Sequence, residues 1–147
     1  MKTPWPGLGL WRITLSVWRT LTACACAHSP MPPSCPSGAN LRPDMFFGEW
    51  QVQLAGATVP ISLRLGPHPE HAGSLKGELM QGQHRYAVVA DWDEGEFTLE
   101  ESRDGVRIAA TWLGKVQSGS CAQIINGTRQ AGSGAEQHFE MRSERLR

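Results

Sequence analysis

The sequence lacks an excess of charge of either sign: 14 Lys and Arg balance 14 Asp and Glu over 147 residues, for a formal net charge of +0. This balance excludes a strongly basic nucleic-acid-binding protein and an acidic, solvating tail. No run of about 18 or more apolar residues occurs, so no transmembrane helix is predicted. Only 19% of the residues are charged, whereas 16 glycines and 10 prolines indicate many turns. We therefore expect one β-rich domain rather than a helical bundle.

Acidic residues are also missing from the start of the chain, where the first is Asp44. Residues 1–30 contain three basic residues and no acidic one, which leaves 11 basic and 14 acidic residues, a net of −3, in residues 31–147. A basic, acid-free beginning is typical of targeting segments. The zero net charge is therefore the sum of two unlike parts.

Two interpretations of residues 1–27 stay open. In the first they form a secretory leader, with a basic front, an apolar stretch at 13–18 and small residues after it. Residues 21–24, Leu-Thr-Ala-Cys, resemble the lipobox of bacterial lipoproteins, so Cys24 would carry a lipid anchor and the protein would belong to the cell envelope or be secreted. In the second, the true start lies downstream, at Met31 or Met45, and a start at Met45 gives a cytoplasmic barrel. The charge of Arg19, which directly follows the apolar stretch and shortens it, favours this second interpretation.

Residues 29–44 contain five prolines and three serines. This composition cannot bury a core and is typical of an extended tether. We expect a disordered Pro- and Ser-rich linker over 28–45, followed by one folded domain over 46–143.

From residue 46 onward, apolar residues recur at every second position, which is the period of a β-strand. Turn signals separate the runs, and Asp104-Gly105 supplies the positive φ angles that a tight hairpin needs. No segment keeps helical spacing over more than about two turns. We expect eight short strands, at 50–54, 59–65, 75–79, 86–90, 97–99, 106–112, 121–128 and 138–142.

Evenly spaced hairpins predict an all-β fold, an antiparallel up-and-down barrel of about eight short strands. One apolar face per strand would fill the inside of the barrel, and closure would remove the exposed edges of an open sheet. A two-sheet sandwich fits the same pattern and remains the alternative.

Gly48-Glu49-Trp50 opens the first expected strand. A Gly-x-Trp at this place resembles the start of the calycin barrels, the lipocalins, avidins and related small proteins. In lipocalins this Trp closes one end of the barrel beneath an Arg of the last strand. The resemblance, which extends over 46–142 by strand number and order, therefore implies a barrel-closing pair of Trp50 and Arg142, with Arg129 as the second choice.

The size of the chain is also similar to that of bacterial inhibitors of secreted metalloproteases. Those inhibitors are compact eight-stranded barrels of the cell envelope, and a flexible N-terminal segment enters the protease cleft. The resemblance implies a protein partner as the second function. The chain departs from these inhibitors because it lacks their close pair of cysteines in the early strands.

The aromatic side chains Trp92, Trp112 and Tyr86 are the candidate ligand-binding residues, because their rings can stack on a flat molecule. The same rings can instead fill the core, since eight short strands enclose little space. Our first hypothesis is a non-enzymatic barrel that binds a small apolar or planar ligand at one open end, near Trp92 and Trp112.

Metal and catalytic chemistry have little support in the sequence. His68 and His71 lie on a proline-containing loop, so no helix sets them on one face as in His-Glu-x-x-His sites, and only His84 offers a third ligand. The chain has no Gly-rich phosphate loop, no Ser-His-Asp set and no paired catalytic carboxylates. We expect no metal, no cofactor and no enzymatic activity.

The four cysteines fit an exported protein. A bridge between Cys35 and Cys121 would tie the linker to the barrel. If the chain instead starts at Met45, only Cys121 remains, as a small buried hydrophobic residue.

Overall fold

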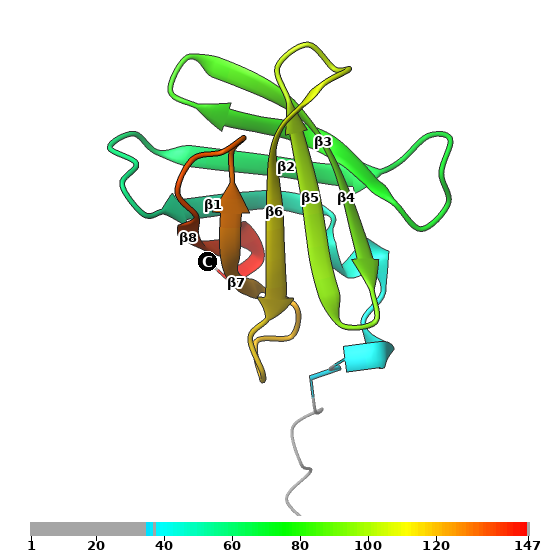
Figure 1. The fold of residues 1–147 in the computed structure, drawn as a ribbon. Coiled ribbons are helices and arrows are strands. Elements are labelled where there is room, and N and C mark those ends of the chain that lie inside the picture. The colour runs from blue at the N-terminus through cyan, green and yellow to red at the C-terminus, as the bar shows by residue number, and fades with distance from the viewer. Residues whose placement is uncertain (1–34, 37, 147) are drawn as a thin grey trace, which may run out of the picture. The chain divides into compact units, whose positions relative to one another are not determined.

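A computed structural model describes residues 35–36 and 38–146, whose arrangement is shown in Figure 1. The eight strands form one antiparallel sheet that closes into a barrel in sequence order. This confirms the all-β up-and-down barrel and excludes the two-sheet sandwich. The strands are β1 (Gly48–Leu54), β2 (Ile61–Pro67), β3 (Leu75–Gln81), β4 (His84–Asp93), β5 (Glu96–Ser102), β6 (Ile108–Val116), β7 (Ile124–Gln130) and β8 (Gln137–Ser143).

Pairing of the first and last strands closes the barrel, with Val52 opposite Met141 and Leu54 opposite Phe139. Every second residue of each strand points inward, so the apolar set predicted from the period of two forms the core. The largest fully buried side chains include Trp50, Trp112, Phe97, Leu63, Leu79, Leu99, Ile125 and Met141. The inside of the barrel is therefore packed with the protein's own side chains. Within the described residues, no helix has the length and apolarity needed to cross a membrane.

Three strands begin later than the alternation predicts. Val59 is 42% exposed and lies ahead of β2, because Pro60 follows it and has no N–H for a ladder. Val106 is 85% exposed, because its N–H and that of Arg107 bond to the Asp104 carboxylate rather than to a neighbouring strand. Cys121 has φ 53°, in the left-handed region, so β7 begins after it.

The described part of the segment expected to be a linker, residues 35–36 and 38–45, differs from an extended tether. It contains two short 3-10 helices, η1 (Gly38–Asn40) and η2 (Pro43–Phe46), and Leu41 between them is buried in the core. The sequence does not predict that this segment packs on the barrel, because most of its residues are proline or small polar residues. One buried leucine, Leu41, and one disulfide, Cys35–Cys121, hold it there. The leader and lipidation predictions for residues 1–27, Cys24 included, lie outside the described residues.

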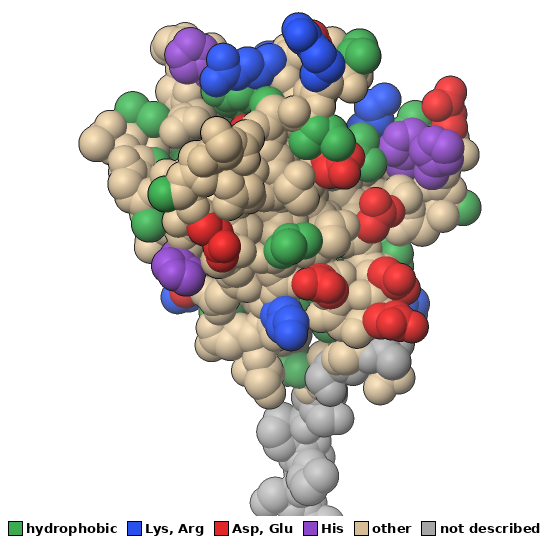
Figure 2. Space-filling model, viewed as in Figure 1, with side chains coloured by type: hydrophobic (Ala, Val, Ile, Leu, Met, Phe, Trp, Pro, Cys, Tyr) green, Lys and Arg blue, Asp and Glu red, His purple; other side chains and the backbone are tan. Residues whose placement is uncertain are grey.

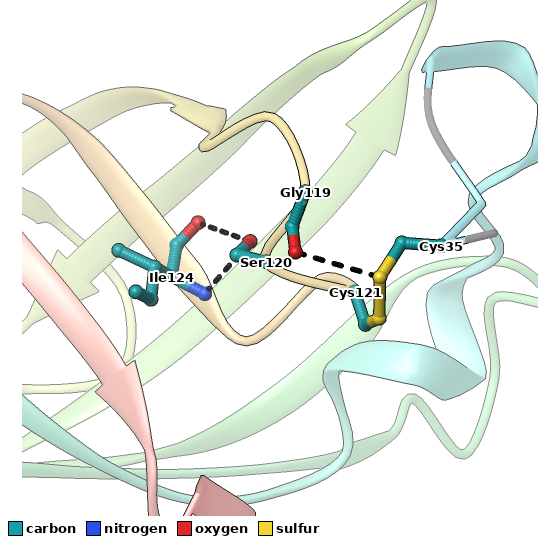
Figure 3. The surroundings of a disulfide bond; sticks show 5 residues. All are labelled: Cys35, Gly119, Ser120, Cys121 and Ile124. Carbon is teal, nitrogen blue, oxygen red and sulfur yellow. Dashed lines mark hydrogen bonds between the residues drawn. A yellow bond between two sulfur atoms is a disulfide. The ribbon is translucent and has the colours of Figure 1, made fainter. Parts of the chain in front are cut away.

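A disulfide joins Cys35 to Cys121 in the β6–β7 connection, across 86 positions of the sequence and a Cα–Cα distance of 4.6 Å (Figure 3). The connection is held beside it by Ser120, whose Oγ accepts from the N–H of Ile124 at 3.3 Å. The bridge thus fixes the start of the described chain at the end of the barrel where β6 finishes and β7 begins.

Phe46 closes this same end of the barrel, which we call the closed end. Its ring is fully buried and lies 5.1 Å from the ring of Trp92, 5.7 Å from that of Phe97 and 6.5 Å from that of Trp50. The indole Nε1 of Trp50 donates to the carbonyl oxygen of Phe46 at 2.9 Å. Gly48 has φ 123°, a value that favours glycine, and lets the chain turn from this plug into β1.

Removing the disulfide with Cys35→Ser and Cys121→Ser together is expected to cost less than the about 4.6 kcal/mol that chain entropy assigns to a loop closed across 86 positions. The reason is that residues 35–45 can detach while the barrel stays folded. We expect an unchanged far-ultraviolet circular dichroism spectrum and a red shift of tryptophan fluorescence that is absent when Trp92→Phe is added. Loss of the β-sheet spectrum would contradict this account.

Candidate functional site

The end of the barrel opposite the closed end differs from it in chemistry. It is formed by the connections β1–β2, β3–β4, β5–β6 and β7–β8, and the β5–β6 connection stands at the top of Figure 1. A pocket of about 390 Å³ lies here, lined mainly by charged side chains: Glu101, Arg103, Asp104, Arg107, Ile108, Ala109, Arg129 and Ala131. We call this end the mouth.

Glu101 is a buried carboxylate at the floor of the mouth. It is the last inward-facing position of β5 after Phe97 and Leu99, and it is only 2% exposed. Its Oε2 accepts from the indole Nε1 of Trp112 at 3.0 Å and from Nε of Arg129 at 3.2 Å, while its Oε1 accepts from Nη2 of Arg129. Three donors therefore satisfy a charge that would otherwise be costly to bury.

These contacts hold the guanidinium of Arg129, on β7, in one orientation. Its Nη1 donates to Oε1 of Gln137 at 3.0 Å, and its guanidinium lies 5.4 Å from the centre of the Trp112 ring. The ring of Phe139 packs edge-on against Trp112, with centroids 5.0 Å apart. An arginine side chain normally samples many rotamers, so this pinning presents a pre-oriented guanidinium to the pocket.

The β5–β6 loop carries two further arginines and is organised by Asp104. The Asp104 carboxylate accepts from the backbone N–H groups of Arg107 at 2.8 Å and Val106 at 3.0 Å, and from Nε of Arg107 at 2.9 Å. Ser102 Oγ donates to it at 3.1 Å. These hydrogen bonds, those of the Arg107 and Val106 N–H first, hold the pKa of Asp104 well below its ordinary value.

The amide proton shifts of Val106 and Arg107 are therefore expected to stay constant from pH 7 down to about pH 4 and to change only below it. A lowered carboxylate pKa means that the loop's stabilisation is complete above the ordinary value of 3.8 and is lost as pH falls through the lower, folded-state value. The measurement is an NMR pH titration. Asp104→Asn should abolish the transition, and a midpoint at or above 3.8 would contradict the arrangement.

Arg103 has a different environment from the other two arginines. Its guanidinium lies over the ring of Tyr86, 5.7 Å from the centroid. An adjoining pocket of about 330 Å³ is lined by these two residues with His84 and Arg85. Arg85 is paired with Glu78 at 3.3 Å. Among residues 35–36 and 38–146, no carboxylate forms an ion pair with Arg103.

The structure brings two of the three predicted ligand-binding residues to the mouth and leaves the third elsewhere. Tyr86 lines the adjoining pocket of the mouth together with Arg103. Trp112 lies beneath the mouth, where its indole N–H donates to Glu101. Trp92 is near the end of β4 at the closed end, against Phe46, where it borders a separate pocket of about 200 Å³. Trp92 and Trp112 thus belong to opposite ends of the barrel.

The barrel-closing pair needs a correction at its arginine. Trp50 lies at the closed end, but Arg142 is opposite Gln51, points outward and pairs with Glu140 at 2.6 Å. Successive residues of a strand face opposite sides, and Ser143 is the one beside Trp50. Arg145, in the 3-10 helix η3 (Glu144–Leu146), instead donates to the carbonyl oxygens of Met45 and Phe47.

The second choice, Arg129, belongs to the mouth and not to the Trp50 end.

The histidines considered as metal ligands are placed as follows. Nδ1 of His68 accepts from the backbone N–H groups of Glu70 and His71, both at 3.1 Å. Among the residues described, no group of three or more His, Cys, Asp or Glu side chains is placed to hold a metal ion.

Glu101 is absent from the candidate residues of the sequence analysis, and Arg129 appears there only as the second choice for the partner of Trp50. A usable signal exists: Glu101 keeps the spacing of two that starts with Phe97 and Leu99, so it occupies an apolar position. A charged residue in that register must either end the strand or find a buried partner. Its partner lies 28 positions away on β7, which the pattern cannot specify.

Comparison of the chain with protein-family models and with curated protein sequences finds no match. The closed eight-stranded barrel is compatible with the calycin architecture.

Proposed function

We propose that this protein is a non-enzymatic calycin-like barrel that binds a small planar ligand at its mouth. The observation that carries the proposal is Arg129, pinned by Glu101, Gln137 and Trp112 at the floor of a pocket of about 390 Å³. A buried ion pair contributes little net stability compared with apolar packing, so its presence at the floor of a pocket favours a role in recognition.

A planar ligand at the mouth fits better than an apolar one inside the barrel. The interior positions around Trp112, Phe139 and Met141 are filled by their own side chains. The mouth instead offers flat, polar surfaces: the guanidinium of Arg129 and the guanidinium of Arg103 above Tyr86. Guanidinium planes stack on aromatic rings, which supports a ligand that contains one.

Tryptophan fluorescence tests the proposal, because Trp112 lies directly below the mouth. The full chain is titrated with anilinonaphthalene sulfonate, an anionic planar probe, and with 1-naphthol, a neutral one. We expect saturable quenching that Trp112→Phe removes and the matched Trp92→Phe variant, altered at the closed end, retains. No saturable signal with any planar probe, or one that depends on Trp92, would reject the proposal.

A second candidate function is a protein-binding module of the cell envelope, such as a protease inhibitor. Two observations favour it: the barrel interior is filled, and the disulfide fixes Cys35 against the β6–β7 connection beside the closed end. Deleting residues 1–34 leaves the bridge intact. If the upstream segment acts on a protease, the deletion should abolish inhibition of secreted zinc metalloproteases by the full chain; equal inhibition by both forms would remove that segment from the mechanism.

The disulfide also supports export, since such bonds persist in oxidising compartments. We propose a cell-envelope or secreted location, with a lipid anchor at Cys24 as one form of it. The cytoplasmic alternative starting at Met45 would lack Cys35 and therefore the bridge. The mass of the native protein distinguishes a lipidated Cys24, a cleaved leader and a start at Met45.

A further inference from the structure

The charges at the mouth do not cancel. The pocket is lined by three arginines and two carboxylates: Arg129 is paired with Glu101, and Arg107 with Asp104 at 2.9 Å. Among the described residues, no carboxylate pairs with Arg103, which lies over the ring of Tyr86. The side chains that line this pocket therefore carry a net charge of about +1, and the exposed Glu136 of the β7–β8 connection is not part of this lining. Figure 2 shows Lys and Arg side chains gathered at the end of the molecule where the β5–β6 loop stands.

Arg129 also retains donors that no described residue uses. A guanidinium has five N–H groups. The contacts with Glu101 and Gln137 engage Nε, one N–H of Nη1 and one of Nη2. One N–H on each Nη atom is left over, and the side chain is 15% exposed toward the pocket that it lines. A fixed guanidinium with two unused donors is suited to a planar oxyanion.

From this geometry we infer that the mouth binds a small aromatic carboxylate, held by Arg103 and Arg129. The inference rests on the proposed function and specifies its ligand class. A carboxylate is flat, carries one negative charge and accepts N–H donors in a fork, which matches both the excess charge and the free donors. The aromatic part would stack on the face of the Arg103 guanidinium that Tyr86 does not cover.

Two neighbouring chemistries fit less well. A phosphate monoester carries close to two negative charges at neutral pH, more than the single net positive charge of the pocket lining. A neutral planar molecule would leave Arg103 unpaired and the Nη donors of Arg129 without an acceptor, which is costly once water is excluded. The carboxylate is the class that satisfies charge and hydrogen bonds together.

The test compares two probes of the same shape. The full chain is titrated with sodium benzoate and with benzamide, its neutral analogue, by isothermal calorimetry, and each titration is repeated on Arg103→Gln. Arg64→Gln is the matched control, because Arg64 is exposed on the outer face and paired with Glu49 at 3.3 Å. We expect benzoate to bind about tenfold or more tightly than benzamide, a loss of similar size in Arg103→Gln, and no change in Arg64→Gln.

Each other outcome has a distinct meaning. If benzoate and benzamide bind equally and the fluorescent planar probes still bind at the mouth, the carboxylate inference is overturned and the proposed function stands. Benzoate binding that Arg103→Gln does not weaken places the ligand elsewhere and also overturns the inference. If neither of these probes nor the fluorescent planar probes bind, the proposed function fails as well.

Discussion

Replacing Glu101 with alanine is expected to lower the free energy of unfolding by about 3–5 kcal/mol, because the substitution leaves the Arg129 guanidinium buried without its counter-charge. It also removes the acceptor of the Trp112 indole N–H. The measurement is equilibrium unfolding in urea, followed by circular dichroism. A surface substitution of the same type, Glu49→Ala, should change stability by about 0.5 kcal/mol or less, since its ion pair with Arg64 is exposed.

The double variant Glu101→Leu with Arg129→Met separates the loss of the pair from the loss of one partner. When both charges are replaced by apolar groups of similar size, no buried charge is left alone, so stability should recover much of what Glu101→Ala loses. A double variant as unstable as the single one would show that the pair itself, rather than the uncompensated arginine, dominates the effect. The same double variant should lose ligand binding at the mouth even though it folds.

Gly127→Ala is expected to destabilise the barrel by at least about 3 kcal/mol or to prevent folding. Gly127 on β7 is opposite Gly114 on β6, and a Cβ on Gly127 would come within 2.6 Å of the Gly114 Cα and closer still to the carbonyl oxygen of Leu113. Backbone atoms on a paired strand cannot move aside as a flexible side chain can, so the clash must be relieved by shifting β6. Thermal unfolding of the purified variant measures the loss.

Gly66→Ala is the matched control for this effect, because it is also a strand glycine. A Cβ at Gly66 meets no atom closer than the carbonyl oxygen of Lys76 at 4.0 Å. Stability close to that of the parent is therefore expected. Equal losses in the two variants would mean that a general cost of replacing strand glycines, rather than the close approach of β6 and β7, explains the result.

The sequence predicts the barrel well because alternation is a local property. Each strand carries its own period of two and each hairpin its own turn residues, so eight strands and their order follow from short windows such as 75–79. The first residues of the strands are less well predicted. Pro60 has no N–H to donate, and the Asp104 carboxylate binds the N–H of Arg107, so β2 and β6 begin later than the alternation of apolar residues indicates.

The mouth could not be predicted in the same way. Tyr86, Trp112 and Trp92 are alike in the sequence, because each has a ring that can stack on a ligand. Strand direction places Tyr86 and Trp112 toward one end of the barrel and Trp92 at the other. The decisive feature is a contact between Glu101 and Arg129, which are distant in sequence and brought together only when the barrel closes. The burial of Leu41 and Phe46 at the closed end likewise depends on tertiary packing. The surrounding sequence is rich in proline and polar residues, so its composition does not predict this burial.

The two ends of the barrel differ in structure. At the closed end, the disulfide, the 3-10 helices and the aromatic cluster around Phe46 seal the core and fix the entry of the chain. At the mouth, the Asp104-organised loop and the Glu101–Arg129 pair hold arginines around a pocket. The packed interior lies between the two ends, and the polar groups of the mouth face the pocket, where they are available for recognition.

The most direct test of this account is an NMR titration of the full chain with benzoate, which follows the indole Nε1–H resonances after Trp112→Phe and Trp92→Phe have assigned two of them. Because the Trp112 N–H donates to the carboxylate that holds Arg129, its resonance should shift saturably, while that of Trp92 at the closed end stays unchanged. A saturable shift of Trp92 with Trp112 unaffected would contradict the assignment of the mouth as the binding site, and no shift of either would overturn the inference that the mouth binds an aromatic carboxylate.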